Sequence, residues 1–271
     1  MMSIQIAIGI EYDGGAFNGW QRQSHQPSVQ SELEAALSQV ADHPVRTVGA
    51  GRTDAGVHAT GQVASFQTAN ARPMRAWCDG VNALTSAGVK VRWARQVDAD
   101  FNARFSAIAR RYIYLYRIDE GRSPLSDPFT WRSPPLDAQA MRHAAQALLG
   151  EQDFTSFRAA GCQSKSPCRD VRRIDVRCAA NLVALDIEAN AFVLRMVRNI
   201  AGALAQVGRC ERPAGWIAEC LQAKDRALIG KTAPPQGLYL VQVQYPGQDF
   251  PAGGPPPPLA AAGADWLASL A

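Results

Sequence analysis

Residues 4–10 read Ile4-Gln5-Ile6-Ala7-Ile8-Gly9-Ile10, with an isoleucine at every second position. This period places one face of a β-strand on an apolar core. A turn follows at Asp13-Gly14-Gly15, and apolar residues then recur at helical spacing from Val29 to Val40, behind Pro27-Ser28. The spacing predicts an amphipathic helix that packs on the first strand. The chain therefore opens with a strand and a helix that share one core.

Farther along the chain, strands are predicted near residues 45–48, 61–67 and 89–97. Residues 111–118 alternate again, with three tyrosines on one face and aliphatic residues on the other. A strand that is apolar on both faces is expected to be covered on both sides. We therefore expect Tyr114 and Tyr116 to belong to the core.

An irregular connection is predicted at residues 119–136, because this stretch contains Gly121 and four prolines. It separates an N-terminal half, residues 1–118, from a C-terminal half, residues 137–246. The second half is predicted to contain helices at 137–149, 192–207 and 213–224 and strands at 169–178, 182–189 and 238–245.

Strand and helix groups alternate along the chain without regular βαβ units, which favours an α+β fold. We expect two similar halves with a mixed or antiparallel sheet flanked by helices. A Pro-rich tail, residues 247–271, closes the chain, and the stretch from Pro246 to Gly263 is expected to be extended and mobile.

The composition is that of a globular protein, because 271 residues, 47% of them apolar, can bury a core without disulfides or metals. The N-terminus lacks the features of a signal peptide, and no stretch approaches the roughly 18 apolar residues of a membrane span. The cysteines form no C-x-x-C motif, and the four scattered histidines supply no ligand set. We expect a cytoplasmic protein with reduced thiols, no membrane segment and no metal site.

The net charge of +4 is small, but it is unevenly distributed. Residues 101–117 and 158–177 each carry a net charge of +4, and residues 192–212 carry +3, so the rest of the chain carries −7. A phosphate-binding face on an otherwise acidic protein would give this segregation. Solvated arginines on exposed strand faces would give the same count, so the pattern alone leaves both readings open.

One loop concentrates four glycines around an arginine and an aspartate: Gly49-Ala50-Gly51-Arg52-Thr53-Asp54-Ala55-Gly56-Val57-His58-Ala59-Thr60-Gly61-Gln62-Val63. Glycines permit positive φ and the close approach of a bulky ligand. Arg52 is near enough in sequence to be an ion-pair neighbour of Asp54 and to favour its ionised form. By composition alone the loop is either a structural turn or a reactive site.

Seven ordered blocks between about residue 4 and residue 246 resemble the tRNA pseudouridine synthase A family. They are Glu11-Tyr12-Asp13-Gly14 with Gly19-Trp20-Gln21-Arg22-Gln23, Gly51-Arg52-Thr53-Asp54-Ala55-Gly56-Val57-His58, Ala103-Arg104-Phe105-Ser106, Arg110-Arg111-Tyr112, Asp153-Phe154-Thr155-Ser156-Phe157, Phe192-Val193-Leu194-Arg195-Met196-Val197-Arg198-Asn199 and Gly237-Leu238-Tyr239-Leu240. The Pro-rich tail matches no block of the family.

The resemblance implies isomerisation of uridine to pseudouridine at positions 38, 39 and 40 of the tRNA anticodon stem-loop, without cofactor or metal. Asp54 matches the catalytic aspartate of the family, in an active-site cleft between the halves. The reaction breaks the C1′–N1 bond and rejoins the uracil through C5. The carboxylate could attack C1′, add to C6 or remove a C2′ proton, and the sequence does not choose among these routes.

The resemblance also assigns substrate-binding roles to four residues. Arg52 matches the arginine that replaces the flipped base, and Tyr112 the tyrosine that stacks on it. Arg198 matches an arginine that pairs with the catalytic aspartate, and Arg72 matches a stretch that touches tRNA. The expected RNA contacts are Phe101, Asn102, Ala103, Arg104, Phe105, Cys162, Gln163, Ser164, Lys165 and Ser166.

The family resemblance further implies a homodimer that contacts the anticodon stem-loop and the elbow of tRNA. Two other functions fit parts of the sequence. An RNA-binding module that retains the fold without chemistry would share the basic segments, and a small-molecule lyase or hydrolase could use an Asp/Arg site. Pseudouridine formation and salt-dependent tRNA binding separate these alternatives from the enzyme.

Overall fold

The computed structural model describes residues 3–263 and divides the chain into two compact units. The first unit comprises residues up to Arg110 together with Leu240–Gly254. The second comprises Arg111–Tyr239 and the residues from Pro255 onward. After Tyr239 the chain therefore belongs to the first unit again as far as Gly254, and from Pro255 it belongs to the second unit.

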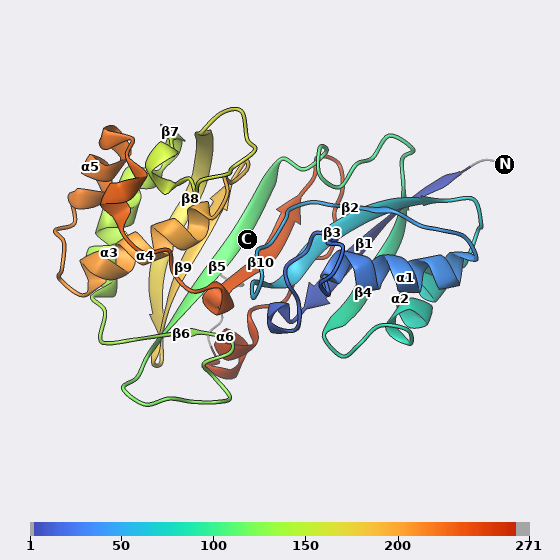
Figure 1. Ribbon diagram of the computed structural model, residues 1–271, viewed down its shortest axis with the longest axis horizontal. Coiled ribbons are helices and arrows are strands. Elements are labelled where there is room, and N and C mark those ends of the chain that lie inside the picture. Colours follow the sequence, from blue (N-terminus) through green and yellow to red (C-terminus); the bar gives the residue numbers. More distant parts are fainter. Residues whose placement is uncertain (1–2, 264–271) are drawn as a thin grey trace. The chain divides into compact units, whose positions relative to one another are not determined.

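Five strands build the sheet of the first unit: β1 (Ile4–Tyr12), β2 (Thr47–Gly49), β3 (His58–Thr68), β4 (Val89–Val97) and β10 (Leu238–Gln244), whose last five residues belong to this unit. The strand order is β4-β1-β3-β10, and β2 pairs with β3. The helices α1 (Val29–Ala41) and α2 (Met74–Asn82) lie side by side along this sheet (Figure 1).

The first strand and the first helix are confirmed. Ile6, Ile8 and Ile10 are buried, as is Leu33 of α1. Ser28 caps α1, because its hydroxyl accepts a hydrogen bond from the amide of Ser31. The isoleucines of β1 and Leu33 of α1 therefore share one core, as the alternation in the strand and the position of the helix predict.

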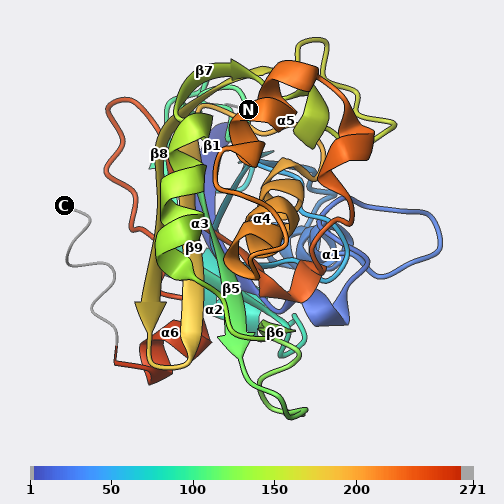
Figure 2. The same ribbon diagram turned by 90° about the vertical axis from the view of Figure 1, so that its left-hand side faces the viewer.

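The sheet of the second unit is mixed. Its strands are β5 (Ala109–Ile118), β6 (Trp131–Ser133), β7 (Gly150–Asp153), β8 (Cys168–Ala179) and β9 (Leu182–Ala189), of which β5 contributes all but its first two residues. The order is β5-β9-β8-β7; β8 pairs antiparallel with β7 and β9, whereas β6 pairs parallel with β5. Figure 2 shows α3 (Ala138–Ala145) in front of β8 and β9. The other helices are α4 (Met196–Gly208), α5 (Trp216–Ala223) and α6 (Pro257–Ala261).

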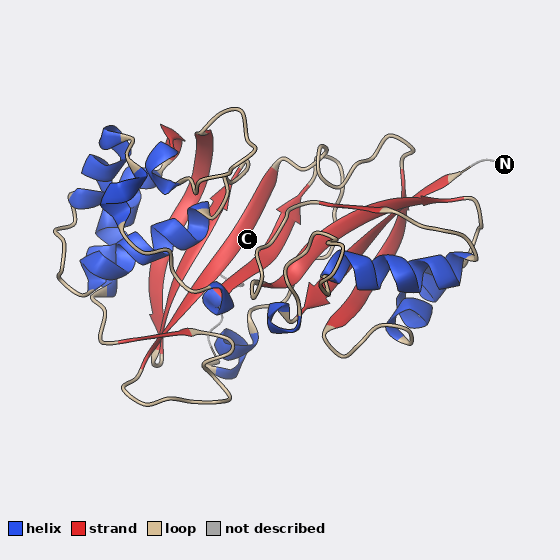
Figure 3. Cartoon of the chain, in the orientation of Figure 1, coloured by secondary structure: helices blue, strands red, loops and turns tan. Residues whose placement is uncertain are grey.

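The predicted α+β class with a mixed sheet is confirmed by these two sets of strands (Figure 3). Tyr114 and Tyr116 are core residues, as expected, and their hydroxyls donate to the carbonyls of Pro234 and Ala201, both at 2.8 Å. Burial raises the pKa of both phenols well above the ordinary value, so both remain neutral donors.

Several elements differ from the sequence expectation. The helices α2 and α6 and the strands β6 and β7 were not predicted, and α3 ends at Ala145 in a 3₁₀ turn rather than at residue 149. The helix expected from residue 192 begins at Met196. Arg195 has a left-handed backbone conformation, with φ of 60°, so the helix cannot extend from Met196 back toward residue 192.

The tail also differs from the expected extended segment. Phe250 stacks on Trp93, and Leu259 of α6 is fully buried. Residues 264–271 of the predicted tail lie outside the described residues. This Pro-rich segment therefore packs against the rest of the protein through its few apolar side chains.

Within residues 3–263, no helix combines the length and apolar character that a membrane crossing needs. All six cysteines are free thiols, of which Cys220 is buried.

Candidate active site

The loop that contains Asp54 connects β2 and β3 in the first unit. Arg52 is exposed and Asp54 is half-buried at the head of a tight turn, in which the amide of Val57 donates to the carbonyl of Asp54 at 3.1 Å. Gly56 closes the turn with φ of 78°, a conformation that side chains rarely adopt. The glycines of the loop therefore shape a turn that presents Asp54 and Arg52.

Two side chains, one on β1 and one on β3, hold this loop by hydrogen bonds. The hydroxyl of Tyr12 on β1 lies 2.8 Å from the hydroxyl of Thr53. The amide nitrogen of Gln62 on β3 donates to the carbonyl of Gly51 at 2.7 Å and lies 3.5 Å from the Tyr12 hydroxyl. All three side chains are buried, so this chain of hydrogen bonds fixes the backbone on both sides of Arg52.

The Gly19-Trp20 turn supports the loop on another side. The amide of Trp20 donates to the carbonyl of Thr53 at 3.1 Å. Gly19 has φ of 92°, and a Cβ there would lie 2.7 Å from the carbonyl oxygen of Thr53 and 3.1 Å from the amide of Ala55. Only glycine allows this approach, which explains why the block at residues 19–23 accompanies the block around Asp54.

Arg110 joins the Asp54 loop to the predicted RNA segment. Its buried guanidinium donates to the carbonyl of Ala50 at 3.1 Å, to that of Arg104 at 2.6 Å and to that of Ala107 at 3.0 Å. A guanidinium has five N–H donors in a rigid fork, which suits it to hold several carbonyls at once. Arg110 is therefore an internal support within the first unit.

The segment 101–106 turns one part inward and one part outward. Phe101 and Ala103 are buried, and the side chain of Asn102 accepts from the amides of Arg104 and Phe105 at 3.0 and 3.1 Å. Arg104 is exposed, Phe105 is 78% exposed, and the guanidinium lies 5.3 Å from the centre of the phenyl ring. The turn thus presents a cation and an aromatic ring together. Arg72, in the loop after β3, is also exposed.

In the second unit, β5 places Arg111 and Tyr112 on opposite faces of the sheet. The buried ring of Tyr112 packs edge to face against Phe192, with ring centres 5.1 Å apart. Arg111 makes two 2.7 Å hydrogen bonds to the buried carboxylate of Asp186, which also accepts from Arg173 at 3.0 Å. The Arg111 pair therefore anchors the strand that carries Tyr112.

Arg198 projects from the first turn of α4 and is half-buried. Its Nε donates to the carbonyl of Ala233 at 2.9 Å, while the amide of Ala233 donates to the carbonyl of Arg198 at 3.1 Å. Gly202, one turn later, has no room for a Cβ, which would lie 2.4 Å from the carbonyl oxygen of Lys231. Gly202 thus lets the segment 231–233 approach the helix.

Asn199 completes this anchoring. Its buried amide donates to the carbonyl of Phe157 at 2.8 Å, and its oxygen accepts from the hydroxyl of Thr232 at 2.7 Å and from Arg226 at 3.2 Å. One side chain therefore ties the start of α4 to two other segments of the second unit.

The expected RNA-contacting loop at residues 162–166 is held by two arginines. Arg158 donates to the carbonyls of Cys162 and Ser164 at 2.8 and 2.7 Å, and Arg169 donates to the Ser164 hydroxyl at 2.6 Å. Gln163, Lys165 and Ser166 are exposed. Although burial opposes the change, hydrogen bonds from backbone amides and from Arg158 lower the pKa of the Cys162 thiol.

Comparison with known proteins gives the relatives of this chain. The family profile described as tRNA pseudouridine synthase matches residues 8–106 and 144–246. The chain belongs to the tRNA pseudouridine synthase family. It is 54% identical over 243 residues to tRNA pseudouridine synthase A from a Klebsiella pneumoniae strain, which covers 89% of this chain and 90% of that relative. The Cronobacter sakazakii protein of the same name is 52% identical over 90% of this chain and 91% of its own length.

Among solved structures, a crystal structure of a Cbf5-Nop10-Gar1 complex aligns with 87% of this chain and 48% of that chain, at 11% identity and a TM-score of 0.35.

The family match covers most of the predicted site. Its first range includes Arg52, Asp54, Arg72 and residues 101–105, and its second includes residues 162–166 and Arg198. Tyr112 lies between the two matched ranges. The structure brings the Asp54 loop and the segment 101–106 together in the first unit, through Arg110. The pairing of Asp54 with Arg198 stays a prediction, since the two residues belong to different units.

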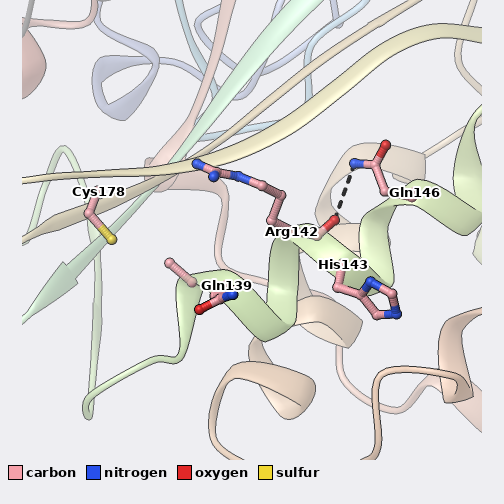
Figure 4. Close-up of a pocket in the computed structure, with 6 residues that line it drawn as sticks. Gln139, Arg142, His143, Gln146 and Cys178 are labelled. Carbon is pink, nitrogen blue, oxygen red and sulfur yellow. Dashed lines mark hydrogen bonds between the residues drawn. The ribbon is translucent and has the colours of Figure 1, made fainter.

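A surface pocket of the second unit has none of the predicted site residues in its lining. It is lined by residues of α3 and the end of β8: Ala138, Gln139, Arg142, His143, Gln146 and Cys178 (Figure 4). Arg142 donates to the carbonyl of Val176 at 2.8 Å and pairs with Asp175 at 3.0 Å, so it is engaged in the fold. We assign no ligand to this pocket.

Proposed function

We propose that the chain converts uridine to pseudouridine at positions 38, 39 and 40 of the tRNA anticodon stem-loop, without a cofactor. The observation that carries the proposal is the Asp54 loop, which Tyr12, Gln62 and the Gly19-Trp20 turn hold by hydrogen bonds and close backbone contact. Family membership, with relatives at 54% identity named tRNA pseudouridine synthase A, supports the substrate class.

The reaction requires a carboxylate next to a flipped nucleotide. The uracil must leave C1′, rotate and rejoin through C5, so that the C5 proton is released. Asp54 would attack C1′, add to C6 or remove the C2′ proton, and all three routes begin with its ionised form. Arg52, exposed two residues away, would occupy the space of the extruded uridine and offset part of the lost stacking.

The other expected site residues divide into contacts and supports. We propose that Tyr112 stacks on the flipped base, that Arg198 stabilises the Asp54 carboxylate and that Arg72 binds the RNA backbone. Exposed residues of the two RNA segments, Arg104, Phe105, Gln163, Lys165 and Ser166, would contact tRNA. The buried or half-buried members, Phe101, Asn102, Ala103, Cys162 and Ser164, hold those segments in shape.

The test measures tritium release from tRNA labelled at C5 of uridine. We expect Asp54→Asn to reduce release by about a thousandfold or more, because the neutral amide lacks the basic and nucleophilic carboxylate. Asp42→Asn is the matched control: Asp42 is exposed in a left-handed cap of α1, where asparagine is well tolerated, and its release should equal that of the wild type.

Equal release by Asp54→Asn and wild type would refute the catalytic assignment. Wild-type protein that binds tRNA but forms no pseudouridine, mapped by carbodiimide-dependent reverse-transcriptase stops, would instead identify an RNA-binding module. Absence of salt-dependent tRNA binding would favour a small-molecule enzyme.

We further propose a cytoplasmic homodimer that contacts the anticodon stem-loop and the elbow of tRNA. The six free thiols are consistent with a reducing compartment, and the bacterial relatives are named tRNA pseudouridine synthase A. Light scattering should give twice the mass of one chain, and a particle with the mass of one chain at working concentration would contradict the dimer.

A further inference from the structure

The stretch after β10 packs into an aromatic cluster of the first unit. We call residues 246–254 the strap. The ring of Phe250 stacks on Trp93 with centres 4.7 Å apart and meets Tyr245 and Phe101 edge to face at 5.4 and 5.7 Å. Gly9 on β1 provides space for this cluster, because a Cβ there would lie 2.0 Å from the indole nitrogen of Trp93.

Two polar contacts fix the strap on either side of Phe250. The guanidinium of Arg95 donates to the carbonyl of Asp249 at 2.7 Å and lies 6.0 Å from the centre of the Phe250 ring. The amide of Gly253 donates to the carbonyl of Val241 at 3.1 Å. A Cβ at Gly253 would lie 2.5 Å from the carbonyl of Thr60, so the strap passes directly over β3.

The same cluster holds the base of the segment 101–106. Phe101 packs on Tyr245 with ring centres 5.0 Å apart, and the Tyr245 hydroxyl donates to the carbonyl of Ala103 at 2.7 Å. The side chain of Gln5 donates to the carbonyl of Phe101 at 2.7 Å. The buried side of this segment therefore rests on residues 245–250, whereas Arg104 and Phe105 at its tip are exposed.

We propose that the strap is a positioning element for RNA binding, which holds the segment 101–106 so that Arg104 and Phe105 face tRNA in a fixed conformation. This inference rests on the proposed function and extends it to residues 247–254, which follow the family match. An exposed arginine and an exposed ring bind RNA more tightly when their conformation is already ordered in the free protein, because less entropy is lost on binding. Phe250 contributes to that order, because it packs edge to face on the ring of Phe101.

The decisive variant is Phe250→Ala. We expect the KM for tRNA to rise about tenfold with kcat within about twofold, since a loss of about 1.4 kcal/mol in binding corresponds to that factor. The Kd for tRNA, measured by filter binding in the inactive Asp54→Asn background, should rise by the same factor. Amide hydrogen exchange of residues 101–106 should become faster, while exchange of the Asp54 loop should not change.

Three further variants separate positioning from stability. Phe250→Tyr keeps the ring and should restore the KM, whereas Gly253→Ala displaces the strap from β3 and should raise the KM in the same direction. Phe66→Leu is the control, because it disturbs the Phe66–Trp77 pair of the same unit, whose ring centres lie 5.1 Å apart, without touching the strap. It should lower the melting temperature and leave the KM unchanged.

A Phe250→Ala protein that melts earlier but keeps the wild-type KM, Kd and exchange of residues 101–106 would overturn the inference, and the strap would then be a stabilising element alone. An equal rise in KM for Phe250→Ala and Phe66→Leu would overturn it as well. Failure of the proposed function is recognised separately, since the wild type would then form no pseudouridine.

Discussion

At the scale of single residues, the placement of Asp54 depends on side chains that never need to touch RNA. The hydrogen bonds from Tyr12 and Gln62 reach Thr53 and Gly51 from strands on which both residues are buried. An error of about 1 Å in the position of a reacting group can reduce a rate about a hundredfold. The two supports therefore belong to the catalytic geometry, although they perform no chemistry.

We expect Tyr12→Phe to lower kcat for tritium release about tenfold and to leave the KM nearly unchanged, because the ring keeps its packing while the loop loses one hydrogen bond. Tyr116→Phe is the matched control: it also removes a buried hydroxyl, which donates to the carbonyl of Ala201 in the second unit. A similar loss of kcat in both variants, or none in Tyr12→Phe, would show that the Tyr12 hydroxyl has no special role.

The sequence predicted Asp54 and Arg52 because the glycines, the acid and the arginine are adjacent in one loop. It did not predict their supports. Tyr12 lies 41 residues from Thr53 along the chain, and Gln62, although only 11 residues from Gly51, lies 50 residues from Tyr12. Tyr12 and Gln62 both lie in sequence motifs, but a motif does not show which hydrogen bonds its residues make. Which hydrogen bond each one makes is determined by the register between β1 and β3, where Ile10 lies opposite Gln62.

At the scale of elements, strong periodicity was predictive and weak periodicity was not. The alternation at residues 4–10 and at residues 111–118 appears as β1 and β5. The unpredicted α2 buries only Trp77 and Val81, so its apolar stripe contains two residues. The unpredicted β7 contains Gly150 and three polar residues and forms because β8 offers it a partner.

The strap illustrates the same limit in a Pro-rich stretch. Composition predicts an extended and mobile tail, since proline disfavours regular structure. A single ring, Phe250, has three aromatic neighbours: Trp93 of β4, Tyr245 directly after β10 and Phe101 of the segment 101–106. Tertiary contacts of one residue therefore decide the conformation of a segment whose local sequence favours none.

At the scale of the whole molecule, the distribution of charge proves to be only partly a surface property. Residues 101–117 carry four arginines, but Arg110, Arg111 and Arg117 are buried and only Arg104 is exposed. Arg117 pairs with Asp119 and Asp127, and Arg111 pairs with Asp186. Counting charges along a sequence cannot distinguish a guanidinium that supports the fold from an exposed one that can bind a phosphate, because both contribute +1.

The salt dependence of tRNA binding measures this difference. Each phosphate contact adds about one unit to the slope of log Kd against log salt concentration, because a condensed counterion is released. We expect Arg104→Ala and Lys165→Ala each to reduce the slope by about one unit, since both side chains are exposed within the predicted RNA segments. Arg209→Ala is the control, because two hydrogen bonds of 2.7 and 3.1 Å already pair Arg209 with Glu211. Its slope should equal that of the wild type, and a reduction as large as that of Arg104→Ala would mean that paired arginines of the basic segments also meet the RNA backbone.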